Sequence, residues 1–247
     1  DEYHVDFGMR YKNPSFKKIL SSWEDKNFKQ IIILPLFPQY ASATNGSVLE
    51  LAMDVIKKWW VIPEISLVSQ FFDHDLFLKA CEENGKKYNF KEYDHVLFSF
   101  HGLPERHVDK VYKDGICKDN DCENGINDAN LFCYKASCYE TAIQLSQRFQ
   151  LQASDFTVCF QSRLGRGWIE PFSDVVIEKL AKEGKKKILV FSPAFVADCL
   201  ETIIEIGDEY QELFEECGGE KIQLVESLND NETWVECLKQ IVLKRRV

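Results

Sequence analysis

The sequence lacks any apolar run long enough to cross a membrane. Its longest uncharged apolar stretch, IIILPLFPQYASA, is broken by Pro35 and Pro38, whereas a membrane-spanning helix needs ~20 apolar residues. The first residues, DEYHVDFGMRY, have neither a basic region nor an apolar core, so they do not resemble a signal peptide. We therefore expect no membrane-spanning segment.

The sequence also has fewer positively charged than negatively charged residues. Lys and Arg number 30 against 40 Asp and Glu, which gives a net charge of −10. Such a field repels a phosphate backbone, so we expect no nucleic-acid partner. Hydrophobic residues at 45% and charged residues at 28% are ordinary for a globular protein and unlike a disordered chain. Peripheral membrane association and oligomeric state stay open.

The cysteines do not form the pattern of a disulfide framework. They number nine, an odd count, with four between residues 117 and 138 and five scattered through apolar segments. This distribution is typical of a reducing compartment and of one metal or cluster site. We therefore expect a cytoplasmic protein.

The sequence does contain a regular alternation of strand-length apolar runs and helix-length amphipathic runs. Strands are predicted at 31–37, 66–71, 95–100, 156–162, 186–192 and 221–227. Helices are predicted at about 47–60, 73–87, 137–150, 171–183, 197–216 and 231–245. Strands that are apolar on both faces and separated by helices favour an α/β fold, with parallel sheet flanked by helices.

One long irregular stretch, residues 101–136, interrupts this alternation. A connection of that length in a compact domain is usually functional, and ligands of open α/β sheets bind beyond the carboxyl ends of strands. His101 lies at such an end, between the apolar run VLFSF and Gly102. From its position alone it is a base, a metal ligand or a turn residue bonded to the backbone.

Four carboxylates follow the fifth predicted strand without any Lys or Arg between residues 188 and 220. At 100° per residue of an α-helix they share an arc of about 80°. They are Asp198, Glu201, Glu205 and Asp208. A solvated polar face is one reading. The other is a path for a divalent cation or for protons, because like charges at this spacing repel one another.

The four clustered cysteines have the spacing C-x4-C-x10-C-x4-C. They are Cys117, Cys122, Cys133 and Cys138. Spacing alone favours structural zinc slightly over an iron-sulfur cluster. Four unrelated reduced thiols are the third reading.

The segment FQSRLGRGWIEPF follows the fourth predicted strand. It does not match the dinucleotide-binding pattern of glycines. Hydrogen-bond donors beside an aromatic side chain suit a flat, anionic, aromatic ligand, although Trp168 taken alone is more often a packing residue. The candidate binding residues are Gln161, Ser162, Arg163 and Trp168.

Several stretches together resemble the ferrochelatase family, whose members insert Fe(II) into a porphyrin at the end of haem synthesis. The stretches are MRYKNPS (9–15), LPLFPQYASATNGS (34–47), FSFHGLPERH (98–107), QSRLGRGWIEP (161–171) and FSPAFVADCLETIIEI (191–206). They occur in the family's order and cover nearly the whole chain.

The resemblance implies two Rossmann-like lobes, each with a four-stranded parallel sheet, and a porphyrin between them. Two strands are predicted before residue 72 and four after residue 94, so we expect an incomplete first lobe that lacks its N-terminal portion. Residues 1–72 would be the remainder of the N-terminal lobe. Residues 73–247 would form the C-terminal lobe, with the four-cysteine insert at 117–138.

The resemblance also implies roles for the candidate residues. His101 is similar to the family's active-site histidine, and Glu201 to its metal-binding and catalytic glutamate. Asp198, Glu205 and Asp208 are similar to its acidic path. Cys199 stands where many members have a second histidine. The insert resembles the segment of bacterial members that carry a 2Fe-2S cluster, which favours that cluster over structural zinc.

These observations predict a ferrochelatase that inserts Fe(II), its metal substrate, into protoporphyrin IX or coproporphyrin III. The reaction needs a base near the ring centre, because the porphyrin loses two pyrrole protons, and imidazole suits both proton transfer and ferrous iron. A porphyrin- or haem-binding protein without turnover is one alternative. A chelatase for another metal or tetrapyrrole is the second.

Overall fold

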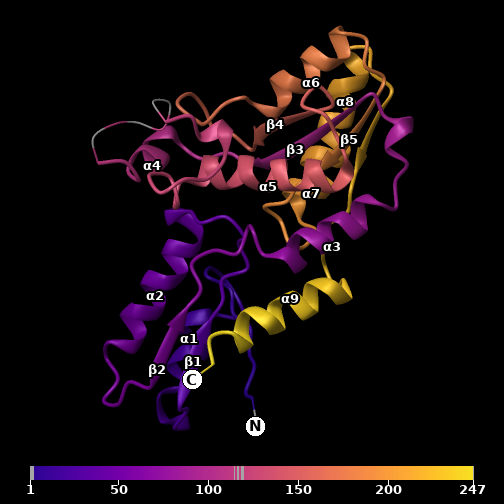
Figure 1. The fold of residues 1–247 in the computed structure, drawn as a ribbon. Helices are drawn as coiled ribbons and strands as arrows, with labels where there is room; N and C mark the ends of the chain where they lie inside the picture. Colours follow the sequence, from indigo (N-terminus) through magenta and orange to yellow (C-terminus); the bar gives the residue numbers. More distant parts are fainter. Residues whose placement is uncertain (1–2, 114, 116, 118–119, 247) are drawn as a thin grey trace.

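A computed structural model of the chain describes residues 3–113, 115, 117 and 120–246 and contains two parallel sheets (Figure 1). The small sheet pairs β1 (Gln30–Ile33) with β2 (Glu64–Leu67). The large sheet has the strand order β4-β3-β5-β6. Its strands are β3 (His95–His101), β4 (Phe156–Gln161), β5 (Lys187–Phe191) and β6 (Lys221–Leu224).

All six predicted strands are confirmed, and most are shorter than expected. The predicted and observed strand ends differ because hydrophobic spacing and composition locate the apolar run, whereas hydrogen bonds between neighbouring strands define where a strand ends. β1 stops at Ile33 although the apolar run continues to Phe37. Pro35 cannot donate a ladder hydrogen bond, and it pushes the residue before it out of regular pairing.

Helices flank both sheets. The α-helices are α1 (Phe16–Ser21), α2 (Ser47–Ile56), α3 (Asp75–Gly85), α4 (Glu105–Asp109), α5 (Tyr134–Phe149), α6 (Ser173–Lys182), α7 (Leu200–Ile203), α8 (Tyr210–Glu216) and α9 (Glu232–Leu243). Shorter turns are η1 (Glu24–Lys26), η2 (Ser42–Gly46), η3 (Phe90–Glu92), η5 (Cys122–Asn124) and η6 (Glu205–Glu209). None of the helices in the described ranges has the length and apolar character needed to traverse a bilayer.

The prediction of one continuous helix over 197–216 is wrong. The helical segment begins at Leu200, and a π-helical turn, η6, separates α7 from α8. A π turn adds a residue to the helical repeat and shifts the phase of everything after it. The 100° periodicity used to place the four carboxylates on one face therefore does not hold across this segment.

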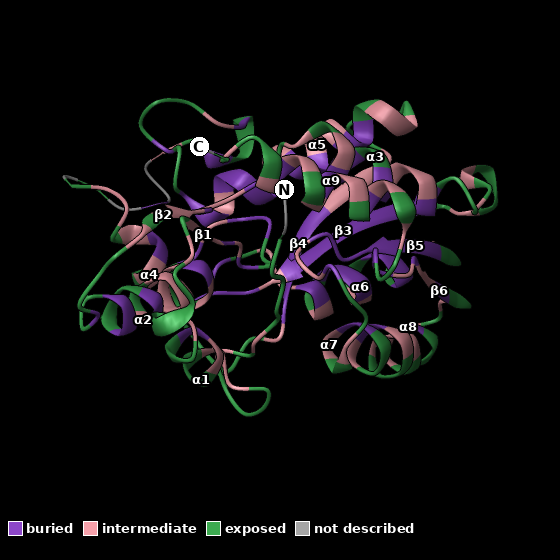
Figure 2. Ribbon diagram, turned by 90° about the horizontal axis from the view of Figure 1, so that it is seen from below, coloured by how far each residue is buried: buried purple, intermediate pink, exposed green. Residues whose placement is uncertain are grey.

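The core lies on both faces of the large sheet, whose strands are mostly buried (Figure 2). One face packs against α3, α5 and α9, and the other packs against α6 and α8. Phe98, Phe100 and Phe160 are each at most 1% exposed, and burying one such side chain contributes about 1.5–3 kcal/mol. This packing fixes the carboxyl ends of β3 and β4.

The last helix connects the two sheets. α9 packs against α3 and then runs toward the small sheet (Figure 1). There Gln30 Nε2 donates to the Arg245 carbonyl at 2.6 Å. The division of the chain at residue 72 stays a prediction.

Candidate functional site

His101 is the last residue of β3, and its imidazole is held in one orientation. The ring Nδ1 lies 2.6 Å from the Gly102 carbonyl oxygen. A carbonyl can only accept, so Nδ1 carries the proton and Nε2 of the neutral ring keeps its lone pair. The ring lies near two aromatic side chains, with centroid distances of 6.5 Å to Trp168 and 6.2 Å to Phe195. An oriented base with a free nitrogen therefore stands at this strand end.

Gly102 is required by the close approach of β4 behind the histidine. Its N–H donates to the Gln161 carbonyl at 2.7 Å. A Cβ at this position would lie 2.9 Å from that same oxygen and 3.2 Å from Trp168 Cε3. The Gly102 that follows the histidine in sequence thus serves close packing of two strand ends.

Glu205 anchors the helical segment to the end of β4. Its carboxylate accepts hydrogen bonds from the Ser162 backbone N–H at 2.7 Å and from the Ser162 hydroxyl at 2.5 Å. Gln161 Nε2 donates at 3.2 Å and the Tyr210 hydroxyl at 2.9 Å. Ser162 has φ +60°, a strained backbone that these bonds help to hold. Burial and the Glu205 carboxylate raise the pKa of Tyr210, so its hydroxyl stays a donor.

Gln161 is 1% exposed and organises the centre of this network. Its Nε2 also donates to the Glu201 carbonyl at 2.7 Å, and its Oε1 accepts from the Ser99 hydroxyl at 2.9 Å. Ser99 in turn contacts the Ser173 hydroxyl at 3.0 Å. The amide therefore joins three elements inside the protein, where buried polar groups need partners.

The other predicted carboxylates take different positions. Glu201 lies half-buried in α7, and Asp208 lies exposed in η6. Asp198 precedes the helix and accepts from the Ser227 N–H at 3.0 Å and from Asn229 Nδ2 at 2.8 Å. Partial burial opposes ionisation, but these hydrogen bonds outweigh it and lower the pKa of Asp198. The structure thus gives Asp198 a capping role at the end of β6.

Cys199 is the N-cap of α7, beside Glu201. Its N–H donates to the Thr202 hydroxyl at 3.0 Å, which closes the first turn. Partial burial and the neighbouring Glu201 carboxylate raise the pKa of the Cys199 thiol. At this position the thiol is protonated rather than a thiolate ready to bind metal.

Three of the four insert cysteines meet in one buried group. The Sγ atom of Cys122 lies 3.7 Å from those of Cys117 and Cys133, and the three sulfurs fall within 4.8 Å of one another. The Tyr112 hydroxyl contacts Cys122 Sγ at 3.2 Å, and the Cys117 N–H donates to Asp109 Oδ1 at 2.8 Å. We call Cys117, Cys122 and Cys133 the cysteine trio.

The chemistry of the cysteine trio fits a thiolate-binding metal. Hydrogen bonds from the other two thiols lower the pKa of Cys133 to about 3, and thiolates are the ligands that zinc and iron-sulfur clusters take. Cys138 is fully buried on α5 and lies outside the trio. Burial raises the pKa of Cys138, so this thiol stays protonated beside the trio.

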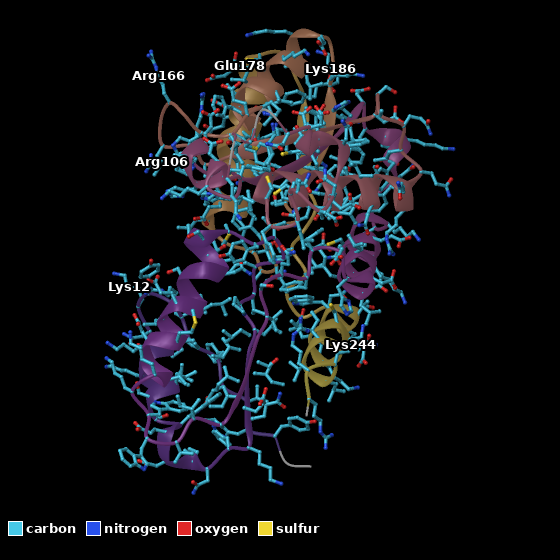
Figure 3. All side chains as sticks on the ribbon, turned by 60° about the vertical axis from the view of Figure 1, so that its left-hand side comes forward. Lys12, Arg106, Arg166, Glu178, Lys186 and Lys244 are labelled. Carbon is cyan, nitrogen blue, oxygen red and sulfur yellow. The ribbon has the colours of Figure 1, made fainter. Side chains whose placement is uncertain are left out.

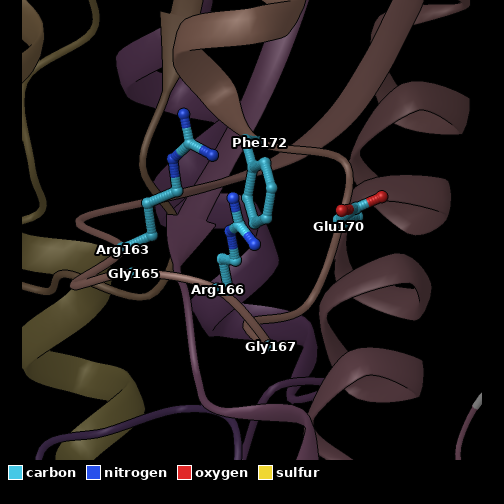
Figure 4. Close-up of a pocket in the computed structure, with 6 residues that line it drawn as sticks. All are labelled: Arg163, Gly165, Arg166, Gly167, Glu170 and Phe172. Carbon is cyan, nitrogen blue, oxygen red and sulfur yellow. The ribbon is translucent and has the colours of Figure 1, made fainter.

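A cationic hollow lies on the loop after β4 (Figure 4). Arg163 packs on the Phe172 ring, 4.1 Å from its centroid, and pairs with Asp174. Arg166 lines the same hollow. Glu105 N–H donates to the Gly167 carbonyl at 2.9 Å, which joins α4 to this loop.

Arginine side chains gather where α4 meets this loop. Arg106 of α4 and Arg166 project from the same side of the molecule (Figure 3). Trp168 is half-buried and forms an isolated antiparallel β-bridge with Pro104, which brings this loop back toward the end of β3. The residue of this loop that lies near the imidazole is Trp168, at 6.5 Å between ring centroids.

Sequence reasoning missed Tyr134 and Phe195. The Tyr134 hydroxyl donates to the His101 carbonyl at 2.8 Å, and burial raises the pKa of Tyr134, so the hydroxyl keeps its proton. Phe195 faces the imidazole from the loop after β5. Position was the available signal, since Tyr134 directly follows Cys133 and Phe195 follows a strand end.

The comparisons with known proteins agree with one another. The family model described as Ferrochelatase matches residues 1–246. The chain is 42% identical over 238 residues to a ferrochelatase of Ectopseudomonas mendocina, covering 95% of this chain and 70% of the relative. It is 41% identical over 243 residues to a ferrochelatase of Legionella pneumophila, covering 98% and 72%.

A solved structure shares the fold. SirB from Bacillus subtilis with Fe3+ superposes with a TM-score of 0.62, covering 94% of this chain and 78% of that one. The two sequences are 14% identical, so this likeness concerns the fold alone.

Proposed function

The chain belongs to the ferrochelatase family, and we propose that it inserts Fe(II) into a porphyrin at the carboxyl edge of the large sheet, with His101 as the central base. The observation that carries this proposal is the orientation of the His101 ring. Nδ1 is tied to the Gly102 carbonyl, so Nε2 is the atom free to take a pyrrole proton or contact iron.

Glu201 is the second proposed catalytic group. It lies half-buried in α7, whose backbone is tied to β4 through Gln161. A carboxylate is a hard oxygen ligand that holds ferrous iron weakly. We assign Glu201 to metal binding together with His101 and to acceptance of the second pyrrole proton.

Asp198, Glu205 and Asp208 form the proposed acidic path for iron or protons. Asp208 is exposed and Glu205 half-buried, so the two descend from the surface toward the end of β4. Four hydrogen-bond donors contact the Glu205 carboxylate. We therefore assign Glu205 a fixed position on the path rather than a movement that carries the iron or proton along.

The porphyrin is assigned to the face formed by Trp168 and the loop after β4. A porphyrin carries carboxylate side chains, and Arg163 supplies a guanidinium at the hollow beside Phe172. Ser162 and the buried Gln161 shape the same strand end. Comparison of turnover on protoporphyrin IX and coproporphyrin III measures which of the two is the substrate.

The cysteine trio is the proposed ligand set of a 2Fe-2S cluster, with Cys138 as the fourth ligand. Structural zinc is the alternative. Either group, when bound, would cross-link residues 117–138 and stabilise the insert. All nine cysteines carry free thiols, which fits a reducing compartment, and we propose the cytoplasm.

The proposed reaction is tested by anaerobic iron insertion followed by porphyrin absorption. We expect His101→Ala to lower kcat by at least about 100-fold, because a positioned base contributes 10²–10⁴-fold. His107→Ala, a half-buried histidine on α4, is the matched control and should keep turnover. Near-normal turnover of His101→Ala would refute the role of His101. Porphyrin binding with no turnover by the native chain would favour a binding protein instead.

A further inference from the structure

The peptide that joins His101 to Gly102 is held from two sides. Its N–H, on Gly102, donates to the Gln161 carbonyl of β4 at 2.7 Å. Its carbonyl, on His101, accepts from the Tyr134 hydroxyl of α5 at 2.8 Å. The Gly102 carbonyl, one peptide further on, holds the imidazole Nδ1. The ring orientation is therefore set by a backbone that α5 helps to fix.

Tyr134 occupies the first position of α5, and Cys133 is the N-cap of the same helix. The Tyr134 side chain is 7% exposed, so its hydroxyl has little access to water as a substitute partner. The Ser137 N–H and hydroxyl both donate to the Cys133 carbonyl at 3.0 Å. The first turn of α5 thus joins the cysteine trio to Tyr134 through two consecutive residues.

We propose that Tyr134 is a positioning residue for His101, through which the ligand state of the cysteine trio reaches the imidazole. This inference rests on the proposed role of His101 in the reaction. Cys133 contributes its sulfur to the trio, 3.7 Å from Cys122 Sγ. A metal held there would fix the position of Cys133. Because Cys133 is the N-cap of α5, the metal would also fix the first turn of this helix and with it the Tyr134 hydroxyl that orients the His101 peptide.

The physical basis is the short range of the hydrogen bond. A hydroxyl–carbonyl bond weakens steeply beyond its normal distance, and a buried carbonyl without its donor is penalised. The His101 peptide would then rotate, and the Gly102 carbonyl would carry Nδ1 with it. A misplacement of about 1 Å is enough to reduce a rate strongly.

The first experiment compares Tyr134→Phe with Tyr139→Phe. Both substitutions remove one hydroxyl from α5, but the Tyr139 ring packs against Phe160 on β4. We expect Tyr134→Phe to lower kcat about three- to ten-fold, the effect of one net hydrogen bond, with an unchanged KM for porphyrin. Tyr139→Phe should leave both constants near those of the native chain.

The second experiment reads the histidine directly. The chain has five histidines. In the spectrum of protein labelled with ¹⁵N-histidine, the signals that disappear in His101→Ala are those of the His101 ring nitrogens. We expect the Nδ1 signal to shift in Tyr134→Phe. We also expect it to shift in Cys122→Ser, with Tyr134 intact, and to stay in place in Tyr139→Phe.

The outcomes separate this inference from the proposed function. An unmoved Nδ1 signal in Tyr134→Phe overturns the positioning role, even when His101→Ala is inactive. An unmoved signal in Cys122→Ser overturns the link to the cysteine trio. If His101→Ala stays active while the signal shifts, the proposed role of His101 fails and the positioning by Tyr134 stands.

Discussion

Ser162 donates both its backbone N–H and its hydroxyl to the carboxylate of Glu205, at 2.7 and 2.5 Å. The pair joins the loop after β4 to the π-helical turn η6. Hydrogen bonds to an ionised acceptor are shorter and stronger than neutral ones. These hydrogen bonds therefore hold the end of β4 and the start of η6 together as one unit.

Loss of the Glu205 charge should loosen this unit. We expect Glu205→Gln to lower the free energy of unfolding by about 1–3 kcal/mol, because four partly buried donors lose their charged acceptor. Urea unfolding monitored by circular dichroism measures it. Asp208→Asn changes an exposed carboxylate on the same turn and should stay within about 0.5 kcal/mol of the native value. Equal effects of the two substitutions would contradict the anchoring role of Glu205.

Asp94 should contribute to the acid sensitivity of the fold. The backbone N–H groups of Lys186 and Lys187 donate to its carboxylate at 2.7 and 2.9 Å and lower the pKa of Asp94. A lowered folded-state pKa stabilises the protein above the unfolded value of about 3.9, and that stability is lost as pH falls through the folded-state pKa.

The unfolding curves of native protein and Asp94→Asn should therefore converge with acid. The difference in unfolding free energy is expected to be largest at neutral pH and to shrink below about pH 4. Urea titrations across this range measure it. Asp230→Asn alters an exposed aspartate on another loop and serves as the control. A difference that grows with acid would disprove the assignment.

Metal content should depend on Cys122, whose sulfur lies 3.7 Å from those of both other members of the trio. Cys122→Ser is expected to lose bound metal and the associated visible absorption, since a hydroxyl is a poor ligand for soft metals. Elemental analysis and an absorption spectrum of anaerobically purified protein measure both. Cys217→Ser, a half-buried cysteine on α8's C-terminal side, should keep them. Full metal retention by Cys122→Ser would exclude the trio as the site.

The spectrum of the native protein also decides the kind of group. Absorption bands of a 2Fe-2S cluster with equal iron and sulfide would support our proposal. Zinc in the absence of such bands would select the structural metal instead.

The arginines at the hollow should act on substrate binding. We expect Arg163→Gln and Arg166→Gln each to raise the KM for a porphyrin with free carboxylates and to leave kcat nearly unchanged, because in the proposed site they would contact the periphery rather than the reacting nitrogens. The methyl ester of the same porphyrin should lose this difference. Lys186→Gln, directly before the amino end of β5, is the charge-matched control. A lowered kcat with constant KM would place the arginines elsewhere in the mechanism.

Much of the fold could be predicted from the sequence, because the spacing of hydrophobic residues indicates which segments are buried strands or helices. The buried strands VLFSF and KILVF were found for this reason. The carboxyl ends of parallel strands meet at the same edge of a sheet. For this reason the predicted strands place His101 near Ser162, and in the structure His101 pairs with Gln161, the residue before Ser162. The order of the strands in the sheet adds that β3 lies between β4 and β5.

The rest depended on local geometry that periodicity does not encode. Asp198 lies before α7, and the π turn at η6 changes the phase of the helix before Asp208, so the four carboxylates do not share one helical face. Gln161 was predicted to bind substrate from its place at a strand end, and the structure adds that its amide is hydrogen-bonded to Ser99, Glu201 and Glu205. Tyr134 acts through a backbone carbonyl, a partner that sequence patterns do not reveal.

The return of α9 to the small sheet has a consequence for the order of folding. The hydrogen bond between Gln30 and Arg245 spans 215 residues. Contacts so distant in sequence form late, because the loop between them must close first. During synthesis the contact between β1 and the end of α9 can therefore form only after residues 232–246 have left the ribosome, whereas β1 and β2 can already pair with each other and pack against α1 and α2.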